Sequence, residues 1–323
     1  MSDLNVHLRE DFDEETIALL RLHLNTRISL TLGSNVSAET QILVAGRPTR
    51  EQLLVAPNLR TVIVPWAGIP EGTQQLLREF PQVTLHNLHH NAAATAEMAA
   101  ALLLAAAKFI VPLDQKLRAN DWTPRYAPSR SIGLESKTAL IVGYGQIGQR
   151  VGRVCRGLGM DVIATRRAQV EPDGVAEVHP SADLPQLLPR AGALIITAPL
   201  TPETRGLIGE HELARLPRGA LLVNVGRGAI VDEAALYRAL QSGHLAAAGL
   251  DVWYNYPDDE ASRANTPPAH YPFHELDNVV MSPHRGGDEA GIDARRMQQL
   301  AELLNAAARG EALSNRVDVV AGY

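Results

Sequence analysis

Short apolar runs alternate with amphipathic segments along this chain of 323 residues. In its N-terminal part, the predicted strands are 5–8, 28–32, 42–46, 61–66 and 83–88, and the predicted helices between them include 14–24 and 73–80. Parallel strands need long crossover connections, which are usually helices. The alternation therefore predicts an α/β protein in which helices cover both faces of a parallel sheet.

A second series of the same kind begins at Lys137. Its predicted strands are 138–143, 161–166, 176–179, 193–198, 220–225, 247–252 and 278–283, and a helix is expected over 288–308. Between the two series lie a long alanine-rich helix, expected over 92–111, and a connection rich in Pro and Ser, 121–137. The chain is long enough for two cores, so we expect two doubly wound parallel-sheet domains in tandem.

Composition excludes several classes of protein. The net charge is −6 and Lys and Arg form no dense cluster, so we expect no nucleic-acid partner. Cys155 is the only cysteine, which rules out an internal disulfide and favours a reducing compartment. The N-terminal segment is charged, and the apolar stretch 92–111 carries Glu97 and Lys108. We therefore expect no signal peptide and no membrane partner, but a soluble, cytoplasmic protein.

The segment ALIVGYGQIGQRVGR places a G-x-G-x-x-G motif directly after an apolar strand and at the start of a helix. In this context Gly143 makes the tight turn, Gly145 lets the backbone approach a pyrophosphate, and Gly148 permits close helix–strand packing. The N–H groups of Gln146 and Ile147 would then bind phosphate at the positive helix end. The predicted dinucleotide contacts are Gly143, Tyr144, Gly145, Gln146, Ile147 and Gly148.

The strand after this motif indicates which dinucleotide is preferred. In sites that prefer NAD it ends in an acidic residue that binds the ribose 2′-hydroxyl, but here it ends VIATRRAQ, without an acid. Thr165, Arg166 and Arg167 stand where a 2′-phosphate would need a hydroxyl and cationic groups. We therefore predict NADP as the preferred cofactor, with NAD as the alternative.

Arg227 stands between two glycines at the end of another apolar run, LLVNVGRGAIVDE. The run predicts a buried strand, and Asp232 marks the start of a helix, so Arg227 is expected at the edge of the sheet. Flanking glycines let a backbone approach a ligand closely and adopt positive φ. From these residues alone, both a ligand-binding arginine and a solvated loop arginine remain possible.

With these features, the chain resembles the D-2-hydroxyacid dehydrogenase family, whose members include formate, phosphoglycerate, glyoxylate/hydroxypyruvate and phosphite dehydrogenases. The resemblance covers nearly the whole chain and depends on the glycine motif, APLTPETRGLIG, LLVNVGRGAIVDEAAL, GLDVW and SPHRGG. It implies a flavodoxin-like substrate domain, residues 1–100 plus 288–323, and a Rossmann nucleotide domain, residues 101–287. It also implies an active site in the cleft and a homodimer.

The same resemblance implies a role for individual residues. Arg227 matches the catalytic arginine that binds the substrate's carboxylate and polarises its carbonyl, and His284 matches the general acid/base. Asp251 matches the position that binds the nicotinamide carboxamide. The substrate carboxylate would be bound by backbone N–H groups of Ala67, Gly68 and Ile69. Further implied cofactor contacts are Ala198, Pro199, Thr204, Val225, Gly226 and Gly286.

One residue departs from the family pattern. Most members have a glutamate five residues beyond the aspartate of LDV, where its charge raises the pKa of the histidine, but here the position holds Tyr256. A tyrosine hydroxyl is neutral at pH 7, although it could accept a hydrogen bond from His284. Alternatively, Asp258, Asp259 or Glu260 could supply the missing acid.

Three interpretations of the activity follow. The expected one is NAD(P)-dependent reduction of a small anionic 2-oxo acid to the D-2-hydroxy acid, with Tyr256 as a third catalytic residue beside Arg227 and His284. The second is hydride transfer without a proton relay, as in the formate dehydrogenases, which also lack the acid. The third is a catalytically weak, cofactor-sensing binding protein of the same fold.

Two further features of the sequence bear on ligands. Arg285 replaces a residue that is usually small or apolar, so it could bind a second anionic group of the substrate or pair with a nearby acid. His86, His89 and His90 lack cysteine neighbours and metal-ligand spacing, so they are predicted to be loop histidines rather than metal ligands.

Overall fold

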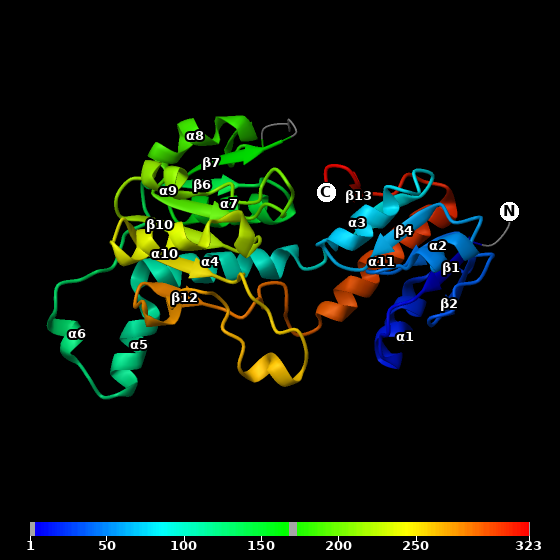
Figure 1. The fold of residues 1–323 in the computed structure, drawn as a ribbon, viewed down its shortest axis with the longest axis horizontal. Coiled ribbons are helices and arrows are strands. Elements are labelled where there is room, and N and C mark those ends of the chain that lie inside the picture. Colours follow the sequence, from blue (N-terminus) through cyan, green and yellow to red (C-terminus); the bar gives the residue numbers. More distant parts are fainter. Residues whose placement is uncertain (1–3, 168–172, 323) are drawn as a thin grey trace. The chain divides into compact units, whose positions relative to one another are not determined.

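The computed structural model describes residues 4–167 and 173–322 and divides the chain into two compact units (Figure 1). Unit 1 consists of Met1–Asn91 and Asp288–Tyr323, and unit 2 of Ala92–Gly287. The helix α4 (Ala92–Lys108) lies wholly in unit 2, whereas the boundary expected after residue 100 would divide it.

Unit 1 is built on a single sheet. Its strands lie in the order β2 (Ile28–Leu32), β1 (Leu4–Leu8), β3 (Ile42–Val44), β4 (Thr61–Val64), β5 (Thr84–Asn87) and β13 (Arg316–Val317). The first five are parallel and have the order of a flavodoxin-like sheet, which confirms the prediction. The last, β13, pairs antiparallel with β5 and was not predicted, because two residues give no recognisable pattern. His86, expected in a loop, lies buried in β5.

Both faces of this sheet are covered, and its inner strands β3 and β4 are buried on both sides. Ile42, Val44 and Ile63 pack with side chains of α1 (Glu14–His23) and α11 (Ile292–Arg309). Leu43 and Val62 face the other way, toward α2 (Arg50–Val55) and α3 (Glu71–Leu77). The loops at the carboxyl ends of the strands therefore project from a rigid, two-sided core.

Unit 2 is a Rossmann fold. Its parallel strands lie in the order β8 (Glu177–Pro180), β7 (Asp161–Arg166), β6 (Thr138–Val142), β9 (Ala193–Ile196), β10 (Ala220–Asn224), β11 (Leu245–Leu250) and β12 (Val279–Met281). One face packs on α4 and α7 (Gln146–Gly157), and the other on α8 (Leu184–Leu187), α9 (Glu210–Arg215) and α10 (Glu233–Gln241). From β6 the chain adds β7 and β8 on one side, and from β9 it adds β10, β11 and β12 on the other side. Open α/β sheets bind ligands at such a switch point, which here lies between β6 and β9.

The prediction of a single helix over 92–111 is wrong. α4 ends at Lys108, Phe109 adopts a left-handed backbone with φ 52°, and α5 (Ile110–Arg118) follows at a bend of 67°. Pro112 gives a physical reason, because in a continuous helix its ring would clash with the carbonyl of Lys108. Within residues 4–167 and 173–322, no helix alone has the length and apolar composition to cross a membrane; α4 and α5 have them only as a bent pair.

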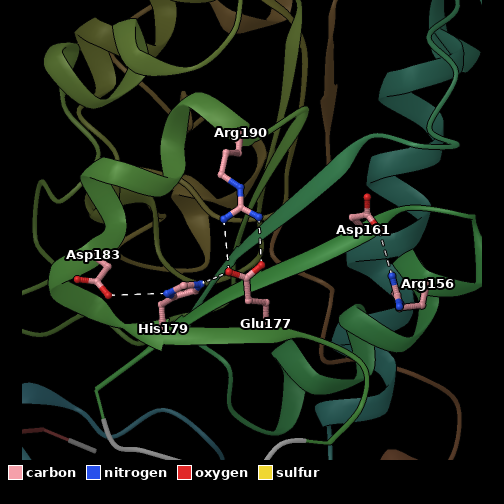
Figure 2. A network of polar contacts seen from close by, with 6 residues as sticks. All are labelled: Arg156, Asp161, Glu177, His179, Asp183 and Arg190. Atoms are coloured by element: carbon pink, nitrogen blue, oxygen red, sulfur yellow. Dashed lines mark hydrogen bonds and ion pairs between the residues drawn. The ribbon is translucent and has the colours of Figure 1, made fainter.

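Charged side chains surround the edge strand β8 of unit 2 (Figure 2). Arg190 donates to both carboxylate oxygens of Glu177, at 3.4 and 3.1 Å, and Nε2 of His179 lies 2.7 Å from the same group. On the far side of the ring, Nδ1 of His179 lies 3.8 Å from Asp183. Exposed edges can pair with other chains, and charged side chains at an edge oppose this.

Candidate active site

The glycine motif forms the turn between β6 and α7. Gly143 has φ +96°, and a Cβ there would lie 2.7 Å from the backbone of Ala198, so the turn requires glycine. A Cβ at Gly148 would lie 2.3 Å from the carbonyl oxygen of Gly143, so helix and strand pack closely. A Cβ at Gly145, in contrast, would meet nothing within 4 Å, and no side chain caps the helix. Open space beside free N–H groups fits a pyrophosphate.

Tyr144 can offer this site only its backbone. Its side chain is buried beneath the motif, and its hydroxyl donates to Oδ2 of Asp173 at 2.7 Å. Burial, together with that bond, raises the pKa of Tyr144, so the hydroxyl stays protonated. The expected contact between Tyr144 and a cofactor is therefore limited to main-chain atoms.

The end of β7 lies against the same turn. The carbonyl of Thr165 accepts from the N–H groups of Gly143 and Tyr144 at 3.0 and 3.1 Å. Nη1 of Arg166 lies 3.4 Å from the carbonyl oxygen of Tyr144. The side chain of Thr165 is buried, Arg166 is half-buried and Arg167 is exposed. Arg166, at the end of β7, therefore contacts the glycine turn. The last two residues of VIATRRAQ lie outside the described residues.

Arg227 is held by a buried asparagine that sequence reasoning missed. Asn224, at the end of β10, accepts from the N–H of Gly226 and donates to the carbonyl of Arg227, both at 3.0 Å. The guanidinium of Arg227 donates to the carbonyl of Gly226 at 2.7 Å. No carboxylate forms an ion pair with Arg227 anywhere in residues 4–167 and 173–322. Its remaining N–H donors are available to an anionic ligand.

The two glycines beside Arg227 serve a purpose other than the expected one. Neither Gly226 nor Gly228 has a positive φ. A Cβ at Gly226 would lie 2.6 Å from the carbonyl oxygen of Ala198, and one at Gly228 would lie 2.3 Å from that of Trp253. Glycine is therefore required because neighbouring backbone packs against this turn. Thr204 lies nearby, since its hydroxyl donates to the carbonyl of Pro199 at 2.7 Å, in the segment that follows Ala198.

His284 follows β12 in a loop with strained backbone. Its φ is +58°, in the left-handed region that non-glycine residues rarely adopt, so surrounding contacts must hold it there. The buried carboxylate of Asp251 supplies them. Oδ1 accepts from the hydroxyl of Ser282 at 2.6 Å and from the N–H of Arg285 at 3.0 Å, and Oδ2 accepts from the N–H of Gly286 at 2.8 Å.

Residues 251–253, directly after β11, connect the two loops. The indole of Trp253 donates to the carbonyl of Ser282 at 2.8 Å, and the carbonyl of Trp253 packs on Gly228. Asp251 was expected to bind a carboxamide; in the structure its carboxylate holds the loop of His284. The tripeptide thus fixes the arginine loop and the histidine loop relative to each other.

The hydrogen bond considered between Tyr256 and His284 does not form. The hydroxyl of Tyr256 accepts from the N–H of Trp253 at 3.1 Å instead. The contact with His284 is between rings, whose centroids lie 5.5 Å apart at an interplanar angle of 56°. Burial raises the pKa of Tyr256, so it supplies no negative charge at neutral pH.

The neighbouring acids are engaged locally. Oδ1 of Asp259 accepts from the N–H of Ser262 at 2.8 Å, and Glu260 pairs with Arg263 at 3.0 Å. Asp258 is exposed. These contacts weigh against Asp259 or Glu260 as a replacement for the family glutamate.

The charge of His284 is set by what surrounds it. Part of the ring is exposed and part lies against Tyr256. Burial of that part lowers the pKa of His284, the positive charge of Arg227 lowers it further, and the negative charge of Asp251 raises it. The net shift is downward from 6.5. Arg227 and His284 therefore act on each other electrostatically within unit 2.

In unit 1, Ala67, Gly68 and Ile69 lie at the carboxyl end of β4 and are half-buried. Their N–H groups have no acceptor among the described residues. Parallel sheets bind ligands at this end of their strands, so the loop is placed to offer backbone donors.

Comparison with known proteins identifies the family. Residues 100–286 match the family model described as "D-isomer specific 2-hydroxyacid dehydrogenase, NAD binding domain". The chain belongs to this family. In this 2-hydroxyacid dehydrogenase, the match covers the glycine motif between β6 and α7, called the fingerprint turn below, and the loops of Arg227 and His284.

Named relatives are similar over parts of their length. A glyoxylate reductase of Korarchaeum cryptofilum is 38% identical over 69% of this chain and 65% of the relative. A D-3-phosphoglycerate dehydrogenase of Mycobacterium leprae is 34% identical over 84% of this chain and 49% of the relative. The chain thus spans less than two thirds of the length of these relatives. Among solved structures, a D-isomer specific 2-hydroxyacid dehydrogenase from Xanthobacter autotrophicus Py2, in complex with NADPH and MES, is 26% identical with a TM-score of 0.81, and all of both chains is covered.

Proposed function

We propose that this 2-hydroxyacid dehydrogenase reduces a small 2-oxo acid to the D-2-hydroxy acid with a nicotinamide cofactor. The observation that carries the proposal is that unit 2 contains both Arg227, which has no carboxylate partner among the described residues, and His284, whose loop is held by Asp251. An arginine fork binds a carboxylate and a neighbouring carbonyl oxygen, and a histidine can transfer one proton. The names of the relatives, glyoxylate reductase and phosphoglycerate dehydrogenase, support this class of substrate.

In this reaction, the bound cofactor supplies the hydride. Arg227 binds the substrate's carboxylate and carbonyl oxygen and stabilises negative charge as it develops on that oxygen. Protonated His284 donates its proton to the same oxygen, which becomes the hydroxyl of the product. Asn224 fixes Arg227, and Asp251 and Trp253 fix the loop of His284, so both groups are positioned before substrate binds.

A screen of cofactor oxidation tests the proposal. NADPH and NADH are each incubated with glyoxylate, hydroxypyruvate, pyruvate, phenylpyruvate and oxaloacetate, and absorbance is followed. In the oxidising direction, NADP⁺ and NAD⁺ are each incubated with formate and with phosphite. Turnover of at least one 2-oxo acid is expected. Oxidation of formate or phosphite alone would favour hydride transfer without a proton relay, which the neutral Tyr256 would also allow. Cofactor binding with no turnover would favour a cofactor-sensing binding protein.

The finer proposal about the cofactor is that NADP is preferred. Three features support it: β7 ends without an acid, Nη1 of Arg166 lies 3.4 Å from the carbonyl oxygen of Tyr144 in the glycine turn, and the Xanthobacter relative was solved with NADPH. A guanidinium can form charge-assisted hydrogen bonds to a 2′-phosphate that NAD lacks.

Arg166→Asp is therefore expected to weaken NADPH binding at least about tenfold and to leave NADH binding nearly unchanged, because loss of a charged hydrogen bond costs roughly 1.5–3 kcal/mol. Calorimetric titration of each cofactor measures both affinities. Arg156→Asp is the matched control, since Arg156 is an exposed arginine in the last turn of α7, at the end opposite the fingerprint. Tighter binding of NADH than of NADPH by the unmodified protein would refute the preference.

We further infer a homodimer, supported by an apolar arm. In Figure 1, α5 and α6 (Thr123–Tyr126) extend from the body of unit 2. The arm exposes Ile110 (53%), Leu117 (50%), Trp122 (60%) and Tyr126 (82%). Apolar side chains gathered on one exposed segment are typical of an interaction surface.

Light scattering during size exclusion is expected to give twice the mass of one chain, and Leu117→Glu is expected to shift the mass toward the monomer. The control is Leu22→Glu, which places the same charge at an exposed leucine of α1 in unit 1 (77%). A wild-type monomer at micromolar concentration, or equal effects of the two variants, would contradict the inference.

A further inference from the structure

The loop after β4 is tied to the end of β5 through two of its carbonyl groups. Nδ2 of Asn87 donates to the carbonyl oxygen of Ala67 at 2.6 Å, and the N–H of Leu88 donates to that of Trp66 at 3.3 Å. Asn87 is buried, with 7% of its surface exposed, and its own N–H donates to the carbonyl of Asn315 at 3.2 Å. The side chain that holds Ala67 is therefore itself fixed.

Holding these carbonyls also sets the direction of the next N–H groups. A trans peptide unit is planar, so its C=O and the following N–H point in opposite directions. The bonds to Trp66 and Ala67 thus turn the N–H groups of Ala67 and Gly68 away from β5. In the part of the chain that the structure describes, neither N–H has an acceptor. Two consecutive donors turned away from the sheet suit a carboxylate oxygen.

A second amide holds the same loop without orienting a donor. Nε2 of Gln74, in α3, donates to the carbonyl of Ile69 at 3.3 Å. The peptide unit that contains this carbonyl ends in Pro70, which has no N–H. Loss of Gln74 would loosen the loop but would redirect no donor, whereas loss of Asn87 would release the N–H of Gly68.

We propose that Asn87 is a positioning residue for substrate binding. By binding the carbonyl of Ala67, Asn87 orients the N–H of Gly68 so that it can donate to the carboxylate of the substrate. The same bond holds the loop of Ala67 and Gly68 in place. The identity of that ligand rests on the proposed function, whereas the contact between Asn87 and the loop does not.

The test compares Asn87→Leu with Gln74→Leu, each of which replaces an amide side chain by leucine. Asn87→Leu is expected to raise KM for the 2-oxo acid about tenfold, because a buried carbonyl loses its partner and the adjacent donor is no longer held. The kcat should change much less, and NADPH affinity should not change. Gln74→Leu should raise KM by less than about twofold, since no donor depends on it.

Two measurements without turnover keep the inference independent of the proposed activity. Calorimetry with oxalate, on protein saturated with NADP, should show weaker binding in Asn87→Leu alone. Backbone amide relaxation measured by NMR should show larger motion of the Gly68 N–H in that variant, because its peptide unit is no longer held by Asn87. Should Asn87→Leu fail to fold, Asn87→Ala gives the same comparison.

The outcomes separate the two proposals. No turnover of any 2-oxo acid would refute the function, while oxalate binding still decides the role of Asn87. Wild-type protein that does not bind oxalate, equal losses in the Asn87 and Gln74 variants, or unchanged oxalate affinity and Gly68 amide motion in Asn87→Leu would each overturn the positioning role.

Discussion

Arg227→Ala is expected to lower kcat/KM for the 2-oxo acid by about 10²- to 10³-fold, the loss typical of removing one donor that stabilises a developing oxyanion. The structure places this guanidinium on a turn clamped by Asn224 and leaves its remaining donors without a carboxylate partner among the described residues. Steady-state kinetics of the variant measure the loss.

Two controls make this result specific. NADPH affinity, measured by calorimetry, should stay within a few-fold of wild type, because the fingerprint turn after β6 is a separate loop. Arg227→Lys should recover only part of the rate, since lysine keeps the charge but lacks the planar fork. An Arg227→Ala enzyme that keeps its activity within a few-fold would show that the assigned role is wrong.

His284→Gln is expected to cost about 10²- to 10⁴-fold in rate, the usual contribution of a general acid. Reduction requires the protonated imidazole, and burial together with the charge of Arg227 lowers the pKa of His284 below 6.5. The wild-type kcat/KM for reduction should therefore be greatest on the acid side of that pKa and fall as pH rises through it toward neutrality.

Tyr256→Glu should raise the pH at which kcat/KM for reduction begins to fall. A carboxylate beside the imidazole favours its protonated form, so we expect the alkaline limit of kcat/KM to rise by about one pH unit or more. Tyr256→Gln is the neutral control and should leave the limit in place. A reductase whose rate barely changes in His284→Gln, or whose pH profile is the same in both Tyr256 variants, would contradict the proton-relay scheme.

The strands of both sheets, apart from β13, could be predicted because most are short runs of apolar or β-branched residues that alternate with helical segments. The glycine motif predicted its own geometry at Gly143 and Gly148, since that geometry is local to one strand, turn and helix. The break at Phe109 could have been found as well, because a proline at position 112 would clash with the carbonyl of Lys108 in a continuous helix.

The contacts that hold the catalytic loops could not be predicted in the same way. Asp251 meets Ser282, Arg285 and Gly286 across more than thirty positions of sequence, and only the pairing of β11 with β12 brings them together. The glycines beside Arg227 predicted that a ligand approaches the backbone closely. In the structure, the carbonyls of Ala198 and Trp253 occupy the space beside these glycines. Such long-range packing leaves no local pattern in the sequence.

The most direct test of the central claim follows the transferred hydrogen itself. The enzyme is incubated with pyruvate or hydroxypyruvate and NADPH carrying deuterium at the transferable C4 position, and the products are analysed by mass spectrometry and chiral chromatography. The account predicts a D-2-hydroxy acid with one deuterium at C2, formed by wild type and strongly diminished in Arg227→Ala. Unlabelled product, the L-enantiomer, or equal yields from both proteins would contradict it.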